Sequence, residues 1–468
     1  MSKTLLLSTI ALLLIGTNAE ADNWGHWRGP TGNSVAENAT PPTEWSDTKN
    51  VKWKVAIPGS GSGSPVIWDN KVFVVTGISE GGSQQQAGGQ SGRPQGAGRP
   101  QGGRPQAGAG GRPQGGGGRP QGGQGRRGGR GGGDAAPTKT VFKVMCFDRN
   151  TGKQLWDQTA VEATPHQPVH GTNNFASASP CTDGKHVYAY FGSRGLYCYT
   201  MDGELKWSKE FGKMETRNSF GEGSSPTLAG DKIIVPWDHE GDSFVFALDK
   251  TTGDVVWKTK RDEPTNWSTP LVVDHDGKKQ VVLNGQTKAR AYDLESGKEL
   301  WSCGGQTERP CASAVAADGL VFVGSGFRGS FLGAFKLDGE GDIKGSKNVV
   351  WSIKSNTPDV ASPLLSDGRL YFYKAKTGIL SCIDAKTGKP HYSASRINGI
   401  NSTYASPVAA GGYVFLTGRS GTTVVINDSE DLEVVATNSV GETVDATPSP
   451  AGNELFIRGE KHLFCIAN

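Results

Sequence analysis

The stretch Cys146-Phe147-Asp148-Arg149-Asn150-Thr151-Gly152-Lys153-Gln154-Leu155-Trp156 contains the pattern that decides the fold. A small residue, then Asp-x-x-Thr-Gly-Lys or a close variant, and then Trp return at 247–257 and 291–301. Glycine at this turn can take a positive φ at little cost, which suits a short hairpin with a bulge. The repeated pattern therefore predicts an array of short antiparallel strands.

Each unit of the array opens on Ser or Thr, usually followed by Pro. The openings are Ser64-Pro65, Ser179-Pro180, Ser225-Pro226, Thr269-Pro270, Ser313-Ala314, Ser362-Pro363, Ser406-Pro407 and Thr447-Pro448. After the first unit they lie 41 to 49 residues apart, the length of one four-stranded propeller blade. The spacing predicts an all-β protein, an eight-bladed β-propeller of four-stranded antiparallel blades.

The last unit offers strands at 454–457 and 462–466 and then the chain ends before a fourth strand. A matching strand with its Trp occurs at the other end of the sequence, at 51–55 around Trp53. An N-terminal strand that pairs with the C-terminal blade would close the ring and remove both exposed edges. We expect this closure, with the propeller at 50–468 and an N-terminal extension at 22–49.

Two segments are expected to stand apart from the propeller. Residues 1–21 combine Lys3, an apolar stretch at 5–15 and Ala19-Glu20-Ala21, which is typical of a signal peptide cleaved near Ala21. The protein is therefore expected to be exported, periplasmic or secreted, without a transmembrane segment. Residues 80–137 hold five Arg-Pro-Gln triplets and almost no apolar side chains, which predicts a disordered insertion in blade 1.

The formal net charge of +3 comes from the insertion. Residues 80–137 contain eight arginines against Glu80 and Asp134, whereas the rest of the mature chain is slightly acidic. Arg-Gly segments of this kind suit polyanions, so the insertion either contacts a polyanion or serves as a spacer.

The seven cysteines do not form an obvious disulfide framework. Cys146, Cys198, Cys382 and Cys465 occupy matching positions in four units, and such positions lie too far apart to bridge, so we expect small core residues there. Cys303 and Cys311 flank one junction between units and could form a bridge or remain free.

The repeat resembles that of the PQQ-like β-propeller family, on the residues Cys146 to Trp156 and their counterparts. The resemblance implies that the recurrent tryptophans dock between neighbouring blades: Trp53, Trp156, Trp207, Trp257, Trp301 and Trp351. Two kinds of relative share this repeat. Quinoprotein alcohol and glucose dehydrogenases hold pyrroloquinoline quinone (PQQ) with calcium near the axis, whereas an outer-membrane assembly protein uses an eight-bladed ring as a scaffold. This chain has no adjacent cysteine pair, an element of the alcohol-oxidising members.

In a propeller, the segments that enter each innermost strand gather at one mouth of the axial channel. Here they immediately precede each Ser/Thr-Pro, and polar, cationic and aromatic groups converging there would suit a ligand. The same residues could instead cap strands and satisfy loop backbones. The candidates are His170, Asn174, Arg217, Glu222, Trp267, Arg309, Asp359, Asn401, Tyr404 and Asp445.

Two other groups of polar residues are not predicted to form a functional site. His166 and His170 could share a metal ion, but Pro165 and Pro168 oppose a helix that would align the two rings, so no metal site is predicted. The run 238–242, Asp-His-Glu-Gly-Asp, is expected to be a solvated hairpin.

The first functional hypothesis is a binding or scaffolding module of the cell envelope, monomeric, that contacts an envelope protein or a small ligand at one propeller face. The alternative is a PQQ-dependent quinoprotein oxidoreductase of the alcohol- or sugar-dehydrogenase type with a non-standard site. No catalytic residue can be assigned from the sequence.

Overall fold

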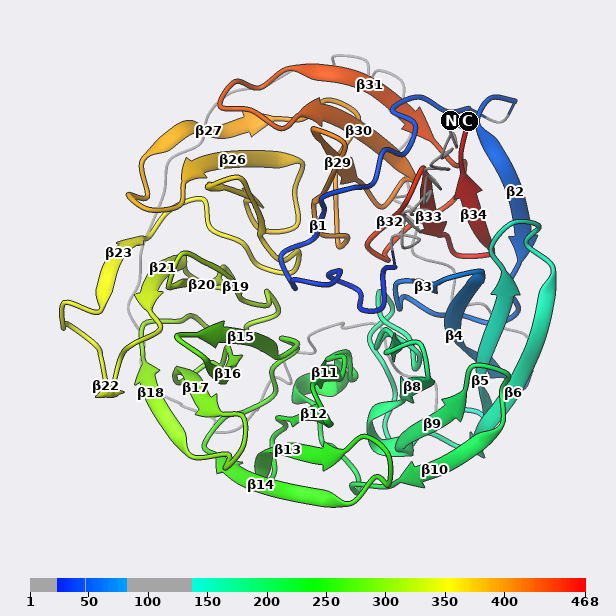
Figure 1. The fold of residues 1–468 in the computed structure, drawn as a ribbon, viewed down its shortest axis with the longest axis horizontal. Coiled ribbons are helices and arrows are strands. Elements are labelled where there is room, and N and C mark those ends of the chain that lie inside the picture. The colour runs from blue at the N-terminus through cyan, green and yellow to red at the C-terminus, as the bar shows by residue number, and fades with distance from the viewer. Residues whose placement is uncertain (1–22, 47, 82–136) are drawn as a thin grey trace, which may run out of the picture.

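The computed structural model describes residues 23–46, 48–81 and 137–468. In this part of the chain eight sheets surround a central axis (Figure 1). Four antiparallel strands follow one another across each blade, and two of the sheets gain a short fifth strand in parallel. The prediction of an all-β eight-bladed propeller is confirmed. The predicted signal peptide, and all but the ends of the predicted insertion, lie outside the described residues.

The first four blades follow the order of the chain, and each begins with its innermost strand. Blade 1 comprises β3 (Val66–Trp68), β4 (Lys71–Ser79), β5 (Thr140–Asp148) and β6 (Gln154–Ala163). Blade 2 comprises β7 (Cys181–Thr182), β8 (His186–Tyr190), β9 (Leu196–Thr200) and β10 (Leu205–Lys209). Blade 3 comprises β11 (Thr227–Ala229), β12 (Lys232–Trp237), β13 (Ser243–Asp249) and β14 (Val255–Arg261). Blade 4 comprises β15 (Leu271–His275), β16 (Lys278–Leu283), β17 (Ala289–Asp293) and β18 (Glu299–Cys303), with β22 (Gly341–Asp342) added in parallel at its outer edge.

The last four blades complete the ring. Blade 5 comprises β19 (Val315–Ala317), β20 (Leu320–Ser325), β21 (Phe331–Lys336) and β23 (Val349–Ile353). Blade 6 comprises β24 (Leu364–Ser366), β25 (Arg369–Tyr373), β26 (Ile379–Asp384) and β27 (Pro390–Arg396). Blade 7 comprises β28 (Val408–Ala410), β29 (Tyr413–Thr417), β30 (Thr422–Asn427) and β31 (Val434–Ser439). Blade 8 comprises β32 (Ser449–Ala451), β33 (Glu454–Arg458), β34 (His462–Ile466) and β2 (Val51–Ala56).

The ring is closed as the sequence predicts. Strand β2 pairs antiparallel with β34, and Trp53 lies opposite Cys465 in the register that places Trp156 opposite Cys146 in blade 1. The N-terminal strand therefore supplies the outer edge of the C-terminal blade. An addition that the sequence did not predict is β1 (Val35–Ala36), which pairs in parallel with the inner strand β28 of blade 7.

Five of the six predicted tryptophans join their blade to the next one through the indole nitrogen. The Nε1 atoms donate to a backbone oxygen in the turn of the following blade, at 2.8 to 3.2 Å: Trp53 to Arg149, Trp156 to Met201, Trp207 to Lys250, Trp257 to Leu294 and Trp351 to Ala385. Trp301 instead donates to the side chain of Gln280, whose amide donates onward to the Leu337 oxygen in blade 5. These tryptophans are thus architectural.

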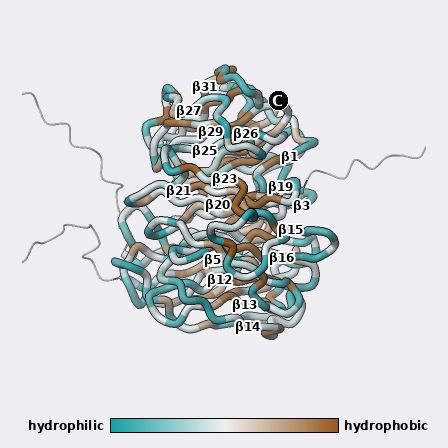
Figure 2. The backbone as a smooth tube through the Cα atoms, turned by 90° about the vertical axis from the view of Figure 1, so that its left-hand side faces the viewer, coloured by the Kyte–Doolittle hydropathy of each residue, from teal (hydrophilic) through white to brown (hydrophobic). Residues whose placement is uncertain are grey.

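The hydrophobic core lies between adjacent blades. In a side view the hydrophobic stretches follow strands in the body of the molecule, and hydrophilic stretches follow the loops (Figure 2). All seven cysteines are free; Cys303 and Cys311 form no bridge, whereas Cys146, Cys198, Cys382 and Cys465 are buried as expected. The helices of the described residues are two short 3-10 turns, η1 (Gly192–Arg194) and η2 (Arg217–Ser219), and none is long and apolar enough to cross a membrane.

The N-terminal extension is integrated with the ring, beyond what the sequence suggested. It forms an antiparallel bridge from Trp24 to Ile67 in blade 1, and Asn33 hydrogen-bonds Ala316 in blade 5. Further contacts reach other blades: Gly25 with Thr182, His26 with Thr227, Asn33 with Leu365, Val35 with Ala409, and Thr40 with Gly452. In blade 4, Leu271 lies so close to Gly32 that a Cβ added at Gly32 would meet it. In Figure 1 this segment, in blue, crosses the centre of the ring.

The contacts of the extension define which end of the channel it covers. Its partners in the blades follow each Ser/Thr-Pro opening along the inner strand, as Ile67 follows Ser64-Pro65. The candidate ligand residues precede those openings. The extension therefore covers the end of the channel opposite the predicted mouth.

Candidate functional site: the axial cavity

The Ser and Thr hydroxyls of the repeated openings form a ring around the axis. In seven of the eight blade junctions the backbone N–H of one opening residue donates to the hydroxyl oxygen of the next, at 2.8 to 3.0 Å. The participants in chain order are Ser64, Ser179, Ser225, Thr269, Ser313, Ser362, Ser406 and Thr447. Ser313 takes part although Ala follows it in place of Pro, so the hydroxyl is the essential feature of the repeat.

All eight hydroxyl residues line one cavity of about 380 Å³ on the propeller axis. This volume is in the range of small-molecule sites. Side chains from the linkers and loops complete the wall with aromatic and charged groups: Trp27, His170, Phe220, Trp267, Arg309, Phe327, Lys376, Tyr404 and Asp445. The cavity is thus amphipathic, with a polar ring and an aromatic, cationic wall.

Arg309 is the most constrained charged residue of the wall. Its backbone has a positive φ of 45°, which is uncommon for a residue other than glycine. The guanidinium carbon lies 3.6 Å from the ring centre of Phe327 and 5.7 Å from that of Phe220, within cation–π range. Nη2 approaches Asp359 Oδ2 at 3.4 Å, whereas the buried Nε has no hydrogen-bond partner among the described residues. A hydrogen-bond donor of a buried cation is therefore left available.

The other charged groups at the mouth differ in how they are paired. Arg419 makes two bonds to Asp445, of 2.6 and 3.0 Å, and its guanidinium lies 4.4 Å from the ring centre of Tyr404. Lys376 contacts the Tyr404 hydroxyl at 3.5 Å, and within the described ranges no carboxylate lies at ion-pair distance from it. Lys376 is therefore a cation available to a ligand.

Burial shifts the titration of the mouth residues. Desolvation raises the pKa of Asp359, and the nearby Arg309 and Lys376 only partly oppose this effect. Desolvation also raises the pKa of Asp445 against the opposing effect of Arg419. The pKa of His170 is lowered by burial and then by Lys376 and Arg309, so the imidazole is favoured in its neutral form. In all three residues the main cause is partial desolvation of the mouth, which favours the neutral form of the side chain.

The floor of the cavity comes from the N-terminal extension. Trp27 lines it, and the buried indole Nε1 of this residue has no partner in the described part of the chain. Next to it, Arg28 is buried and donates to the backbone oxygens of Gly32 and Pro363. Trp27 thus closes the axial cavity at the end opposite the predicted mouth.

The structure brings five of the ten predicted residues together in the cavity wall: His170, Trp267, Arg309, Tyr404 and Asp445. Asp359 joins them through Arg309. Asn174 and Glu222 line a separate cavity of about 40 Å³, to which Trp267 also contributes. The remaining two lie in neither cavity: Arg217 pairs with Glu308 at 3.2 Å, and Asn401 accepts a bond from Arg396.

Sequence reasoning missed Lys376, Phe327, Trp27 and the hydroxyl ring. Lys376 and Phe327 lie in loops between the second and third strands of their blades, not before a Ser/Thr-Pro. These loops also reach the mouth, because the inner strand starts there and the second strand returns to it. The repeated Ser or Thr was a visible signal for the ring, but its meaning depends on contacts between blades.

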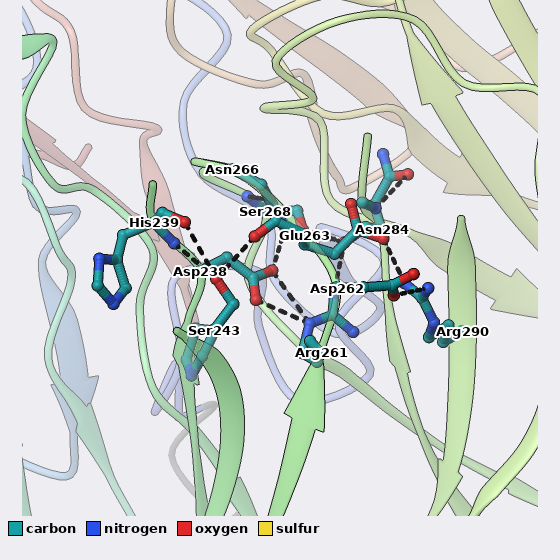
Figure 3. A network of polar contacts seen from close by, with 12 residues as sticks. Asp238, His239, Ser243, Arg261, Asp262, Glu263, Asn266, Ser268, Asn284 and Arg290 are labelled. Carbon is teal, nitrogen blue, oxygen red and sulfur yellow. Dashed lines mark hydrogen bonds and ion pairs between the residues drawn. The ribbon is translucent and has the colours of Figure 1, made fainter. Parts of the chain in front are cut away.

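A buried polar network lies beside the small cavity, between blades 3 and 4 (Figure 3). Arg261 Nε bonds Asp238 at 2.8 and 3.1 Å, and Asn266 bonds both Asp238 and the Asn284 backbone oxygen. Glu263 pairs with Arg290 in the same region. Asp238 and His239 are buried, so the expectation of a solvated hairpin at 238–242 was wrong for its first two residues. The network is saturated and serves as a structural link.

The carboxylates near the mouth do not fit the calcium ion that accompanies PQQ in quinoproteins. Glu222 is bound by Arg194 at 3.1 Å, Asp359 by Arg309, and Asp445 by Arg419. Within 23–46, 48–81 and 137–468 no three His, Cys, Asp or Glu side chains converge as a metal site would require. Calcium needs six to eight oxygen ligands, several of them carboxylates in a site of this kind.

Comparisons with curated proteins find distant quinoprotein relatives. The lanthanide-dependent methanol dehydrogenase of Methylorubrum extorquens is 25% identical over 198 residues, which cover 36% of this chain and 33% of the dehydrogenase. The quinoprotein ethanol dehydrogenase of Pseudomonas putida is 27% identical over 215 residues, which cover 40% of this chain and 31% of the dehydrogenase. The matched part is thus about a third of the length of each relative.

A solved structure and a family profile also match this chain. The quinohemoprotein alcohol dehydrogenase of Comamonas testosteroni aligns with a TM-score of 0.58 over 96% of this chain and 80% of that chain. At 10% identity this likeness shows the fold alone. A family profile described as outer membrane protein assembly factor BamB matches residues 141–390 and 306–466, well over half of the sequence. The chain therefore belongs to this family of PQQ-like β-propeller repeat proteins.

Proposed function

We propose that this protein is an exported binding module of the cell envelope whose axial cavity takes a small anion with a flat apolar part. The observation that carries the proposal is Arg309, a buried cation between Phe220 and Phe327 with an unpartnered Nε on the cavity wall. A buried donor without an acceptor is costly, and a ligand acceptor would remove that cost.

The composition of the wall supports the ligand class. A ligand carboxylate or phosphate could form charge-assisted bonds with Arg309 and Lys376, which are stronger than neutral hydrogen bonds. The rings of Trp27, Phe220, Phe327 and Tyr404 offer flat apolar surface to the rest of the ligand. An anion is favoured over a cation because both available charges on the wall are positive.

Calorimetric titration with benzene-1,3,5-tricarboxylate, a small flat trianion, tests this proposal. The variant Arg309→Gln with Asp359→Asn removes the cation and its carboxylate together, so that no buried charge is left alone. We expect the double variant to bind at least tenfold more weakly than the parent protein. The matched control is Arg217→Gln, because Arg217 precedes the same kind of opening but lies outside the cavity. Equal binding by the parent and the double variant would contradict the proposal.

The quinoprotein oxidoreductase is the second candidate, supported by the activities of the distant relatives and by the cationic and aromatic wall of the cavity. PQQ is itself a flat anion, so it would bind in the proposed mode without calcium. Titration of PQQ in the presence of calcium and in the presence of EDTA distinguishes the two functions. Calcium-independent binding without reduction of an artificial dye supports the binding module; calcium-dependent binding with dye reduction supports the dehydrogenase.

The envelope assignment and the role of the arginine-rich insertion are separate proposals from the sequence. Cell fractionation checks export, and cleavage near Ala21 is read from the mass of the mature chain. Deletion of 80–137 is expected to abolish salt-sensitive binding to heparin, a model polyanion, if the insertion contacts polyanions. Unchanged binding after deletion would leave the insertion as a spacer. The expected monomer is checked by light scattering.

A further inference from the structure

The hydroxyl ring has a property that the wall residues do not share. Its eight side chains are only 2 to 4% exposed, and all eight line the cavity. Seven of the oxygens accept a backbone N–H from the preceding blade. Among the described residues, none of the eight hydroxyls donates a hydrogen bond to the protein.

This pattern leaves one O–H donor on each residue of the ring. A hydroxyl carries one donor and two acceptor lone pairs, so the accepted N–H uses a lone pair and not the hydrogen. The bonds between blades fix the positions of the oxygens, for example Ser179 Oγ at 2.8 Å from Ser64 N. The ring therefore holds several donors in place around the axis without an acceptor from the protein.

Two more donors in the same cavity are unpartnered. They are the Nε1 atom of Trp27 at the floor and the Nε atom of Arg309 on the wall, and both are buried. Beside them, Asp359 Oδ1 is an acceptor without a partner among the described residues, and its carboxylate already faces Arg309. Each ring hydroxyl keeps a free lone pair as well as its donor, so the ring alone suits a ligand of either sign, whereas the donors of Trp27 and Arg309 favour a ligand acceptor.

We propose that the Ser/Thr ring is the subsite for an oxyanion group of the ligand, a carboxylate or a phosphate held on the propeller axis by O–H donors. The inference rests on the proposed function, because it assigns the anionic end of that ligand to the ring and its flat part to the aromatic wall. A cation could in principle use the free lone pairs of the ring. Arg309 and Lys376 in the same cavity repel a cation and attract an anion.

The ring also explains why the repeat retains a hydroxyl at every opening. Removal of any of the seven accepting hydroxyls breaks an interblade bond, and it also removes one donor from the axis. The two roles can be separated, because one serine outside the ring makes an interblade bond without contributing a donor to the cavity. Ser449, fully buried in the inner strand β32, donates its O–H to the Pro65 oxygen at 2.7 Å and is not part of the cavity wall.

Titrations with sulfate, acetate and benzene-1,3,5-tricarboxylate, followed by calorimetry, test the subsite. The test variant is Ser225→Ala with Ser406→Ala, which removes two donors from nearly opposite blades. The controls are Ser449→Ala and the hydroxyl-retaining pair Ser225→Thr with Ser406→Thr. A hydrogen bond to a charged group corresponds to about a tenfold change in affinity or more. We therefore expect about a hundredfold weaker binding in the alanine pair and nearly unchanged binding in both controls.

The outcomes separate the ring from the wall. If the alanine pair binds all three anions like the parent while the Arg309 and Asp359 double variant does not, the ring assignment is overturned and the proposed function stands. If the parent binds no anion, both fail. Binding of potassium or guanidinium in preference to the anions would overturn the charge assignment. If the alanine pair does not fold, the single variants Ser225→Ala and Ser406→Ala are compared with their threonine counterparts, and an unchanged affinity in each single alanine variant overturns the subsite.

Discussion

Tyr404 and Thr172 are 232 residues apart in the sequence, and a hydrogen bond of 3.0 Å joins their hydroxyls at the mouth of the axial cavity. Tyr404 comes from the linker between blades 6 and 7, and Thr172 from the linker between blades 1 and 2. Thr172 continues the contact to His170 Nδ1 at 2.9 Å. The three side chains therefore form a bar across part of the mouth.

Replacement of Tyr404 by Phe would remove this bond but keep the ring that packs against Arg419. We expect the free energy of unfolding to fall by about 1 kcal/mol, the typical contribution of one hydrogen bond. We also expect benzene-1,3,5-tricarboxylate to bind and dissociate faster in stopped-flow experiments, because the mouth is less obstructed. Tyr413→Phe is the control, since Tyr413 lies in β29 away from the cavity. A variant with unchanged stability and rates would show that the bar does not form in solution.

Gly297 allows a second prediction, on the docking of the tryptophans. Its φ is +68°, and a Cβ added there would lie 2.5 Å from ring atoms of Trp257 in the preceding blade. Gly277 has a similar φ of +77° but nothing within 4 Å of an added Cβ. Gly277→Ala should therefore lower the free energy of unfolding by about 1 kcal/mol from backbone strain alone. Gly297→Ala should cost clearly more, because it also displaces the indole that bonds Leu294. Urea unfolding measures both, and equal losses would contradict the docking role.

The sequence predicted the fold well because each blade repeats the same local chemistry. The turn of blade 1, for example, is fixed by Asp148, whose carboxylate accepts bonds from Thr151, and by Gly152 at φ +70°. These are contacts within a few residues, so their pattern can be read in the chain. The closing strand at Trp53 could be predicted because a missing strand and its unpaired copy occurred at the two ends.

The candidate site could be predicted only in part. Arg309, Tyr404 and Asp445 were found because they occupy the equivalent linker in different units. Lys376 and Trp27 were missed, since their place at the cavity depends on which loops reach the mouth and on how the extension crosses the ring. Such contacts between distant segments leave no periodic signal. Arg217 and Asn401 precede openings as the wall residues do, but they do not line the cavity, and the equivalent linkers differ in length.

Arg458 provides a third prediction, on a buried charge without a partner. The residue is 1% exposed, and its Nε, Nη1 and Nη2 atoms have no hydrogen-bond partner among the described residues. Burial lowers the pKa of its guanidinium to about 10. Replacement of such a group by an apolar side chain of similar length is often stabilising. We expect Arg458→Met to raise the free energy of unfolding by about 1 to 3 kcal/mol.

Arg149 is the matched control for this prediction. Its guanidinium is also buried, but it bonds Glu454 and the backbone oxygens of Asp69 and Ala451. Arg149→Met should therefore lower the free energy of unfolding by about 3 kcal/mol, because it leaves Glu454 with fewer partners in a buried position. If both methionine variants lose stability alike in thermal unfolding, Arg458 is satisfied by ordered solvent and the prediction is wrong.

His26 should make the attachment of the N-terminal extension depend on pH. Burial and the nearby Arg28 lower the pKa of its imidazole to about 3. The ring is held in the neutral form, because Nδ1 accepts the Arg28 backbone N–H at 3.3 Å while Nε2 faces the Thr227 hydroxyl at 3.5 Å. The unfolded chain takes up a proton near pH 6.5, and the folded chain does so only near pH 3.

The stabilisation from neutral His26 is therefore fully present above pH 6.5 and is lost progressively as the pH falls toward 3. We expect the free energy of unfolding of the parent to fall in this range by up to about 1.4 kcal/mol per pH unit more than that of His26→Gln, which keeps a polar side chain but cannot titrate. Urea unfolding at intervals of half a pH unit measures the difference. As the pH falls, the backbone amides of residues 24–28 should lose protection from hydrogen exchange before those of the blades. The reason is that His26, the protonated residue, lies where the extension contacts blade 3. Parallel curves for the two proteins would mean that His26 is already solvated, and that the floor of the cavity is held by Trp27 and Arg28 alone.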